Sequence, residues 1–275
     1  MCNFGFCNLS LIPVRAKESH SSEMVNQLLF GETFEILETL NEFVLIRGTL
    51  DNYEGFISRK QFLPLTKDEY EMLMSKDKLF PVNPISTITE TNSGNTIKIL
   101  HGSSLRGFED GRLVIASQSF LTTDPMKSPD AVLDTEMLVQ SALQFLNAPY
   151  LWGGRSLFGI DCSGLTQIVY NIHSIGLQRD SRCQAQQGET IHLLPEALSG
   201  DLAFFDDDEG NITHVGIIIN NRKIVHASGM VRICLLYTSD AADDLLCVDL
   251  GGPRIIKQKK KQQQTTIYAT HQATK

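Results

Sequence analysis

The sequence lacks the cysteine and histidine spacing of a metal site. Its six cysteines include no pair separated by two residues, and none stands in a cluster with histidines at the spacing of a zinc site. Six cysteines in a chain of 275 residues without a leader also do not indicate a disulfide framework. We therefore predict no metal, no cofactor and no disulfide scaffold.

The chain also lacks an excess of positive charge and a long apolar run. Its formal net charge is −8, which argues against nucleic acid or an anionic membrane surface as the main partner. No apolar run reaches the roughly 20 residues that a membrane-spanning helix needs. The first residues show no basic segment followed by an apolar one, so we expect no signal peptide. This predicts a cytoplasmic protein, or a periplasmic or secreted one if the N-terminus is incomplete.

What the chain does contain is a succession of short strands followed by a mixed region. Residues 8–65 alternate apolar and polar positions between turns rich in Gly, Asn and Asp, which predicts a small β-barrel. Residues 80–122 repeat this pattern more loosely, after the helix-forming stretch KDEYEMLMSK. An amphipathic helix is predicted over 130–148, with Pro149 ending it. The expected organisation is therefore a barrel (1–65), a second barrel with a connecting helix (66–129) and an α+β domain (130–233).

The last segment differs in character from the rest. From Cys234 the apolar periodicity weakens, and a basic, glutamine-rich run follows. Residues 234–244 also match the translation of a transposon-end adapter used in sequencing libraries. We therefore interpret residues 234–275 as a non-native tail from adapter read-through, rather than as a last strand and a disordered tail. This interpretation gives Cys234 and Cys247 no functional weight and leaves the third domain without its final strands.

The segment YLWGGRSLFGIDCSG, residues 150–164, sets one cysteine behind a glycine-rich turn. Asp161 is a suitable N-cap, and the apolar residues at 165, 168, 169 and 172 have the spacing of a helix with one buried face. Cys162 then stands at the helix start, where the helix dipole and free backbone N–H groups favour the thiolate. The pattern predicts an activated thiol.

Two histidines follow on predicted strands, His214 in ITHVGIII and His226 in KIVHAS. The turn at 220–223 joins the strands, and a hairpin loop with an odd number of residues puts both histidines on one face. His214 is then placed to take the thiol proton while His226 orients its imidazole. A metal site at these residues would need further carboxylate or thiol ligands, which the sequence does not place at suitable spacing.

Four ordered blocks, PYLWGGRSLFGIDCSG, GDLAFFD, ITHVGIII and IVHAS, resemble the NlpC-type cysteine peptidases, which are papain-like enzymes that cut bacterial cell-wall peptides. The resemblance covers residues 130–233. The two preceding barrels look like the bacterial SH3-type domains of the gamma-D-glutamyl-L-diamino acid endopeptidases. The resemblance implies an α+β fold: a papain-like domain whose cysteine-bearing helix packs on an antiparallel sheet, behind two SH3-like barrels. It also implies murein-derived peptides with a free N-terminal L-Ala as partners.

The resemblance assigns roles residue by residue. Cys162 is implied as the nucleophile, His214 as the general base and then acid, and His226 as the orienting residue. Tyr150 matches the tyrosine that holds the oxyanion together with the backbone N–H of the catalytic cysteine. The implied substrate contacts are Trp152, Asp161, Ser163, Asp180, Ser181, Glu23 and Tyr53. Among these, the last two lie in the first barrel, where a carboxylate paired with the free amine of the substrate would enforce short peptides.

Two other functions remain open from the sequence. One is a wall-binding or adaptor protein with a vestigial papain-like domain. The joint presence of Cys162, His214, His226 and Tyr150 disfavours it, because a decayed site need keep none of them. The other is an amidase or acyltransferase on the same fold, which shares the cysteine–histidine machinery.

Overall fold

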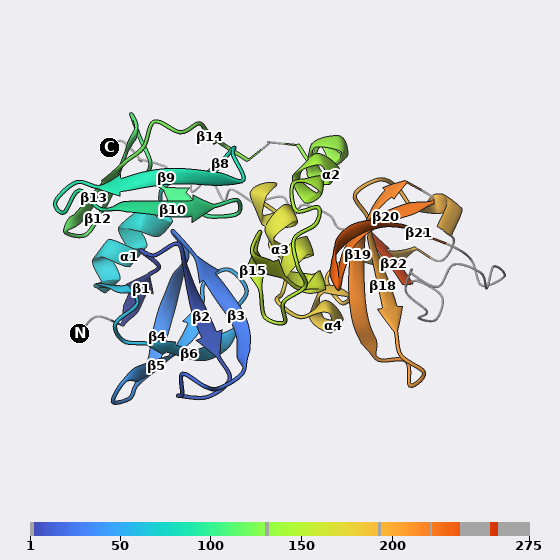
Figure 1. The fold of residues 1–275 in the computed structure, drawn as a ribbon, viewed down its shortest axis with the longest axis horizontal. Coiled ribbons are helices and arrows are strands. Elements are labelled where there is room, and N and C mark those ends of the chain that lie inside the picture. Colours follow the sequence, from blue (N-terminus) through green and yellow to red (C-terminus); the bar gives the residue numbers. More distant parts are fainter. Residues whose placement is uncertain (1–2, 130–131, 192–193, 221, 237–253, 258–275) are drawn as a thin grey trace, which may run out of the picture.

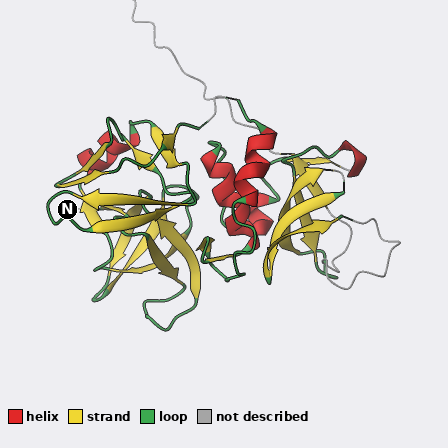
Figure 2. Cartoon of the chain, turned by 45° about the horizontal axis from the view of Figure 1, so that its top comes forward, coloured by secondary structure: helices red, strands yellow, loops and turns green. Residues whose placement is uncertain are grey.

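The computed structural model describes residues 3–129, 132–191, 194–220, 222–236 and 254–257. Figure 1 shows the N-terminal strands on one side, the helices α2 (Thr135–Leu143) and α3 (Cys162–Ile172) in the middle, and a sheet of C-terminal strands on the other side. Figure 2, turned by 45°, again shows these helices between the two β regions. The helix that begins at Cys162 therefore has a β region on either side.

The first β region is a seven-stranded sheet in which every pair of neighbours is antiparallel, in the order β3-β2-β6-β5-β4-β1-β7. Alternate residues of β2 are buried, as the period-two pattern predicted. They pack in a core with Phe34, Val44 and Ile57. The strands are β1 (Phe4–Phe6), β2 (Leu11–Arg15), β3 (Met24–Leu29), β4 (Thr33–Thr39), β5 (Phe43–Gly48), β6 (Glu54–Ser58) and β7 (Leu63–Leu65).

The connecting helix α1 (Lys67–Met74) forms where the sequence predicted it. Its start is fixed by a capping box. The Thr66 side chain accepts from the N–H of Glu69, and the Glu69 carboxylate accepts from the N–H of Thr66. Two of the backbone N–H groups that the helix start leaves unpaired are thereby satisfied.

The strands after α1 form a four-stranded sheet, β10-β9-β13-β12, and a three-stranded sheet, β11-β8-β14. They share an apolar core with the first barrel, and the rings of Phe30 and Phe120 meet edge to face at 5.4 Å. The two N-terminal regions therefore pack against each other. The strands are β8 (Lys78–Pro81), β9 (Ile85–Glu90), β10 (Thr96–Leu100), β11 (Leu105–Arg106), β12 (Arg112–Ile115), β13 (Gln118–Leu121) and β14 (Met126–Lys127).

The third region is a six-stranded sheet, in the order β17-β22-β18-β19-β20-β21, covered on one face by α3. Leu165, Ile168 and Val169 of α3 pack against Val215 and Val225 of the sheet. The remaining elements are β15 (Arg155–Ser156), β16 (Gly159–Ile160), α4 (Ser181–Gln184), β17 (Glu189–Ile191), the 3-10 turn η1 (Leu194–Glu196), β18 (Leu202–Asp206), β19 (Ile212–Asn220), β20 (Lys223–Ser228), β21 (Met230–Leu235) and β22 (Arg254–Lys257).

Helix α2 is shorter than the predicted 130–148. Asp134 is its N-cap and accepts from the N–H groups of Glu136 and Met137, so the helix begins there. At the other end, Asn147 has a φ of 67° and donates its N–H to Val231 of β21. Between these ends, Phe145 and Leu146 donate to carbonyls three residues back, so tight turns follow the α-helix after Leu143.

The first barrel docks on the third region through buried polar contacts. Arg155 forms two hydrogen bonds of 2.8 Å with the carboxylate of Glu32 and also donates to the carbonyl of Gln27. Gly153 lies against the backbone of β3: it has a φ of +75°, and a Cβ added to it would come within 2.4 Å of the Met24 carbonyl oxygen. Both contacts involve the glycine-rich turn that leads to Cys162.

Part of the segment predicted to be a non-native tail is described. Cys234 is buried in β21, paired with Ile224, and residues 254–257 form β22 between β17 and β18. The rest of that segment, including Cys247, lies outside the described residues. Within the described ranges, no helix combines the length and apolar character needed to cross a membrane.

Candidate active site

Cys162 is the first residue of α3, as the spacing predicted. The carboxylate of Asp161 caps this helix by accepting from the N–H of Gly164 at 2.7 Å, and its other oxygen accepts from the N–H of Gly153 at 2.8 Å. One carboxylate thus joins the helix start to the glycine-rich turn. The Cys162 side chain is largely covered, with 7% of its surface exposed.

The surroundings of the thiol include contributions that the sequence did not show. Burial, followed by the charge of Asp161, raises the pKa of the Cys162 thiol to about 12. The N–H groups of Val215 and Ser163 and the charge of Arg179 lower this pKa, but to a smaller extent. The helix begins where the sequence placed it. Its lowering effect on the thiol pKa is nevertheless smaller than the rise caused by the lost hydration of the thiolate. Thiolate formation therefore needs a base, the role that the sequence predicts for His214.

The two histidines lie on the same face of neighbouring strands. Gly216 pairs with His226, so His214 is the diagonal neighbour of His226 across β19 and β20. His214 Nε2 lies 2.8 Å from His226 Nδ1, with the ring planes at 83°. The backbone of Val215 bonds to the Cys162 thiol, so the thiol lies against β19 at the residue that follows His214.

The histidine pair is neutral near pH 7. Burial lowers the pKa of His214 to about 4, with a further contribution from the charge of Arg232. Burial also lowers the pKa of His226 to about 3, followed by the charges of His214 and Arg232. His226 Nε2 lies 3.1 Å from Cys234 Sγ, so both ring nitrogens of His226 have partners. An uncharged imidazole is the form that accepts a proton.

Tyr150 and Trp152 lie on the turn before the helix. Burial, followed by the charges of Cys162 and Asp161, raises the pKa of Tyr150 to about 12, which keeps the phenol protonated. Trp152 is 61% exposed, and its Nε1–H donates to Glu23 Oε1 at 2.6 Å. The structure therefore brings Glu23 of the barrel to the turn that carries Tyr150.

Asp161 and Ser163 are buried and bind Arg179. The Arg179 guanidinium reaches both carboxylate oxygens of Asp161, at 3.0 and 2.6 Å, and the Ser163 hydroxyl at 2.8 Å. Asp180 follows Arg179 and precedes α4, which begins at Ser181. The polar atoms of Asp161 and Ser163 that were predicted to contact substrate thus have protein partners.

Tyr53 also lies at this end of the barrel. Its N–H donates to Asp51 Oδ1 at 2.9 Å, and Asp51 Oδ2 accepts from Gln167 of α3 at 2.8 Å. Burial raises the pKa of the half-buried Tyr53, and the charge of Asp180 is the next cause. The structure therefore brings Tyr53 close to Asp180 and ties its backbone to the cysteine-bearing helix.

The sequence reasoning missed the polar side chains of the barrel that contact the third region, namely Asn26, Gln27, Glu32 and Asp51. One signal was available. Asn26 and Gln27 interrupt the apolar strand MVNQLL, and both are almost fully buried. Adjacent buried amides in a strand indicate polar partners outside that sheet.

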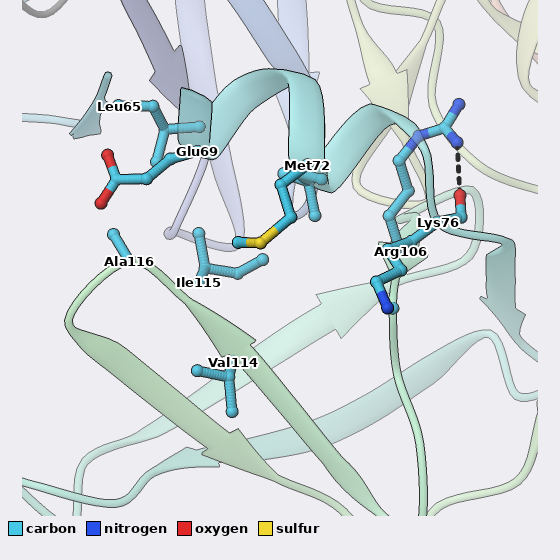
Figure 3. Close-up of a pocket in the computed structure, with 10 residues that line it drawn as sticks. Leu65, Glu69, Met72, Lys76, Arg106, Val114, Ile115 and Ala116 are labelled. Atoms are coloured by element: carbon cyan, nitrogen blue, oxygen red, sulfur yellow. Dashed lines mark hydrogen bonds between the residues drawn. The ribbon is translucent and has the colours of Figure 1, made fainter. Parts of the chain in front are cut away.

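A hollow far from these residues lies between α1 and the hairpin of β12 and β13. It has a volume of about 60 Å³ and is lined by Leu65, Met72 and Ile115 among others. Figure 3 shows these side chains around it, with Arg106 turned away to donate to the Lys76 carbonyl. Elsewhere in the described part of the chain, no three His, Cys, Asp or Glu side chains are grouped to hold a metal ion.

Two protein families match the chain in different places. Residues 147–249 match the NlpC/P60 family, and residues 10–63 match the bacterial SH3 domain. The first match contains Cys162 and both histidines, and the second contains Glu23 and Tyr53.

Curated relatives extend the likeness over both regions. A gamma-D-glutamyl-L-lysine dipeptidyl-peptidase of Bacillus cereus is 38% identical over 241 residues, which are 76% of this chain and 68% of the relative. The chain belongs to the NlpC/P60 family. A protein of the same name from Bacillus subtilis is 27% identical over 219 residues, 73% of this chain and 71% of the relative.

Solved structures agree on the fold. The crystal structure of an NlpC/P60 family protein from Bacillus cereus covers 91% of this chain and 98% of its own, with a TM-score of 0.77 at 19% identity. An NlpC/P60 endopeptidase from Photobacterium damselae covers 86% of this chain and 66% of its own, with a TM-score of 0.71 at 15% identity. The expected α+β fold, an NlpC/P60 domain behind an SH3-like region, is confirmed.

The protein is therefore a cysteine peptidase of the NlpC/P60 family with an N-terminal bacterial SH3 domain. Cys162 is the cysteine that the structure places at a helix start, beside the strand that carries His214. The roles of the individual side chains remain predictions.

Proposed function

We propose that this NlpC/P60 protein hydrolyses the gamma-D-glutamyl-L-diamino acid bond of short murein peptides that carry a free N-terminal L-Ala. The hydrogen bond between Glu23 and Trp152 is the observation that carries the proposal, because it puts a barrel carboxylate beside the turn that leads to Cys162. The names of the two Bacillus relatives support the choice of bond.

In this proposal the reaction starts from the neutral pair. His214 Nε2 faces His226, so Nδ1 takes the Cys162 proton as the sulfur attacks the carbonyl carbon of the gamma-glutamyl bond. His214 must then carry its other proton on Nε2 and donate it to His226 Nδ1. His226 Nδ1 accepts this bond, so His226 carries its own proton on Nε2. The pair of histidines thus fixes one tautomer.

The intermediate collapses by returning the proton. His214 gives the proton to the leaving amine of the diamino acid, which leaves an L-Ala-D-Glu thioester on Cys162. A water then attacks the thioester carbonyl while Nδ1 of His214 takes a water proton, and the thiolate leaves as L-Ala-D-Glu forms. The proton on His214 passes back to sulfur, which restores the neutral pair.

Two groups are proposed to hold the oxyanion of the intermediate. These are the Tyr150 hydroxyl and the backbone N–H of Cys162. The raised pKa of Tyr150 keeps its proton in place as a hydrogen-bond donor at neutral pH. Such donors stabilise the intermediate more than the substrate.

The proposed amine site explains a preference for short peptides. A free ammonium of L-Ala next to Glu23 gains a charge-assisted hydrogen bond. Tyr53, held beside Asp180, would lie along the same end of the site. A peptide extended at its N-terminus, as in intact wall, has no charge to offer there.

The direct test is to incubate the full chain with L-Ala-gamma-D-Glu-L-Lys and with its diaminopimelate analogue. We expect mass spectrometry to detect L-Ala-D-Glu, with no product from Cys162→Ser or from the peptide acetylated on L-Ala. Cleavage of intact sacculus alone would replace the proposal with a wall hydrolase. Binding without turnover would favour an adaptor, and transfer of the acyl group to an added amine in place of water would favour an acyltransferase.

Glu23→Gln tests the amine site separately. Loss of a charged hydrogen bond of about 1.5–3 kcal/mol predicts a fall of roughly 10- to 100-fold in kcat/KM, carried by KM. Glu18→Gln is the matched control, because Glu18 lies in the same loop and is exposed. Equal kinetics of the two variants would contradict the assignment.

A further inference from the structure

Arg179 is a buried junction between the barrel and the start of α3. It is 2% exposed, and its guanidinium contacts three side chains. Two of them, Asp161 and Ser163, flank Cys162 in the sequence. The third is Asn26 of β3, whose Oδ1 accepts from Arg179 Nε at 2.8 Å.

The Asn26 oxygen is itself fixed. Asn26 is 3% exposed, and its Oδ1 also accepts from the N–H of Gln27 at 2.8 Å. Two donors from different parts of the fold therefore converge on one oxygen. An acceptor held by its own strand leaves Arg179 little freedom to move, because a buried guanidinium N–H must keep a partner.

The position of Arg179 affects the thiol pKa, because charges of both signs surround the thiol. The charge of Asp161 raises the pKa of Cys162, and the charge of Arg179 lowers it. Tyr150 is a further titratable group beside the thiol, and His214 lies on β19, next in sequence to Val215, whose backbone bonds to the thiol. If Arg179 moves away from Asp161, the carboxylate is left unneutralised next to the sulfur, and thiolate formation becomes less favourable.

We propose that Asn26 is a positioning residue for catalysis: through Arg179 it holds Asp161, and thereby the start of α3 and the thiol, in the reactive arrangement. The inference rests on Cys162 being the nucleophile of the proposed function, but not on which peptide is cleaved. In this view, the barrel is part of the machinery that prepares the thiol, in addition to any contact it makes with substrate.

The test measures alkylation of Cys162 by iodoacetamide in the full chain between pH 6 and 10, followed by peptide mass spectrometry so that other cysteines do not interfere. Asn26→Leu removes the acceptor at similar volume. We expect its alkylation rate at pH 7 to fall about tenfold, which corresponds to a rise of about one unit in the thiol pKa. Asn26→Asp keeps an acceptor for both donors and should restore the rate to within about twofold of the parent.

Gln27→Leu is the matched control on the same strand. Its side chain accepts from the N–H of Arg155, so the variant loses a buried contact between barrel and third region without touching Arg179. We expect lower stability in urea but an unchanged alkylation profile. If Asn26→Leu behaves like Gln27→Leu, with weaker folding and normal alkylation, Asn26 is merely structural and the proposal fails.

Arg179→Lys provides a second test if Asn26→Leu folds poorly. Lysine keeps the charge but not the fork that bridges Asn26 and Asp161. We expect a loss of alkylation rate similar to that of Asn26→Leu, and no further loss in the double variant, since both act through one chain of contacts. Additive losses would refute the route through Arg179. Alkylation uses no peptide. If the variants lose alkylation rate as expected but the parent chain does not cleave murein peptides, only the proposed substrate is overturned.

Discussion

Replacing Glu32 by glutamine should strongly destabilise the contact between the barrel and the third region. Glu32 is 7% exposed and its partner Arg155 1%, so neither charge has access to bulk water. Glu32 accepts two hydrogen bonds from Arg155 at 2.8 Å and a third from the N–H of Leu29 at 3.0 Å. Glutamine keeps the volume and one carbonyl oxygen but removes the charge that neutralises Arg155.

The expected loss follows from the buried cation that remains. Breaking one partner of a buried ion pair costs about 3–5 kcal/mol. Arg155 then keeps the Gln27 carbonyl and one amide oxygen as hydrogen-bond partners but loses the carboxylate that neutralises it, so we expect a loss within this range. At roughly 2–4 °C per kcal/mol for a chain of this size, the Tm should fall by about 10 °C.

The assay is urea unfolding followed by circular dichroism, with Glu54→Gln as the matched control. Glu54 pairs with Arg47 at 2.7 Å, but its side chain is 48% exposed. A surface pair of this kind contributes at most about 1 kcal/mol. The same substitution is thus made in two ion pairs that differ in burial.

Equal effects of the two substitutions would refute the reasoning, because burial would then not decide the cost. A second comparison uses Glu32→Leu together with Arg155→Met. Removing both charges should destabilise less than Glu32→Gln alone, since no unpaired cation remains. A double variant as unstable as the single one would indicate that packing at this contact, rather than charge, determines its stability.

Other outcomes follow from the site and from a buried histidine outside it. Tyr150→Phe should lower kcat toward the proposed peptide by about 10²–10³ with little change in KM; a KM effect alone would assign Tyr150 to binding. Burial lowers the pKa of His101 to about 4, below its ordinary 6.5, so this residue supports folding above pH 6.5 and its contribution is lost as pH falls toward 4. His101→Leu should therefore flatten the fall in unfolding free energy between pH 7 and pH 4 by up to about 3 kcal/mol, and an unchanged slope in urea titrations would contradict this.

The sequence pattern predicted the helix and strands that carry the site residues, but not the contacts that surround those residues in the fold. Helix α3 began at the predicted residue because Asp161 binds the first turn within a few residues of itself. The two histidines share a face as predicted, but through a register shift between Ile218 and Asn220 rather than through an odd-numbered loop, since the hairpin closes at the pair Asn220–Lys223. In both cases the deciding interaction links residues close in sequence, which is where periodicity and capping rules apply.

The environment of the thiol depends on docking between distant segments, which local pattern does not describe. Asn26 and Arg179 are 153 positions apart, and Gln167 and Asp51 are 116 apart. The burial of Cys162, which raises the pKa of its thiol, arises from packing against β19. After helix α2, Asn147 likewise bonds to the distant strand β21.

The tight approach of Gly153 to Met24 limits how the two regions can be recombined. A glycine with a φ of +75° lets the backbone of β3 touch the turn directly, and any side chain there would strike the Met24 carbonyl. A foreign barrel fused in front of this peptidase domain would have to present a strand backbone at the same place. The N-terminal barrel and the glycine-rich turn therefore have to be exchanged together in any domain fusion, although they lie more than a hundred residues apart in the chain.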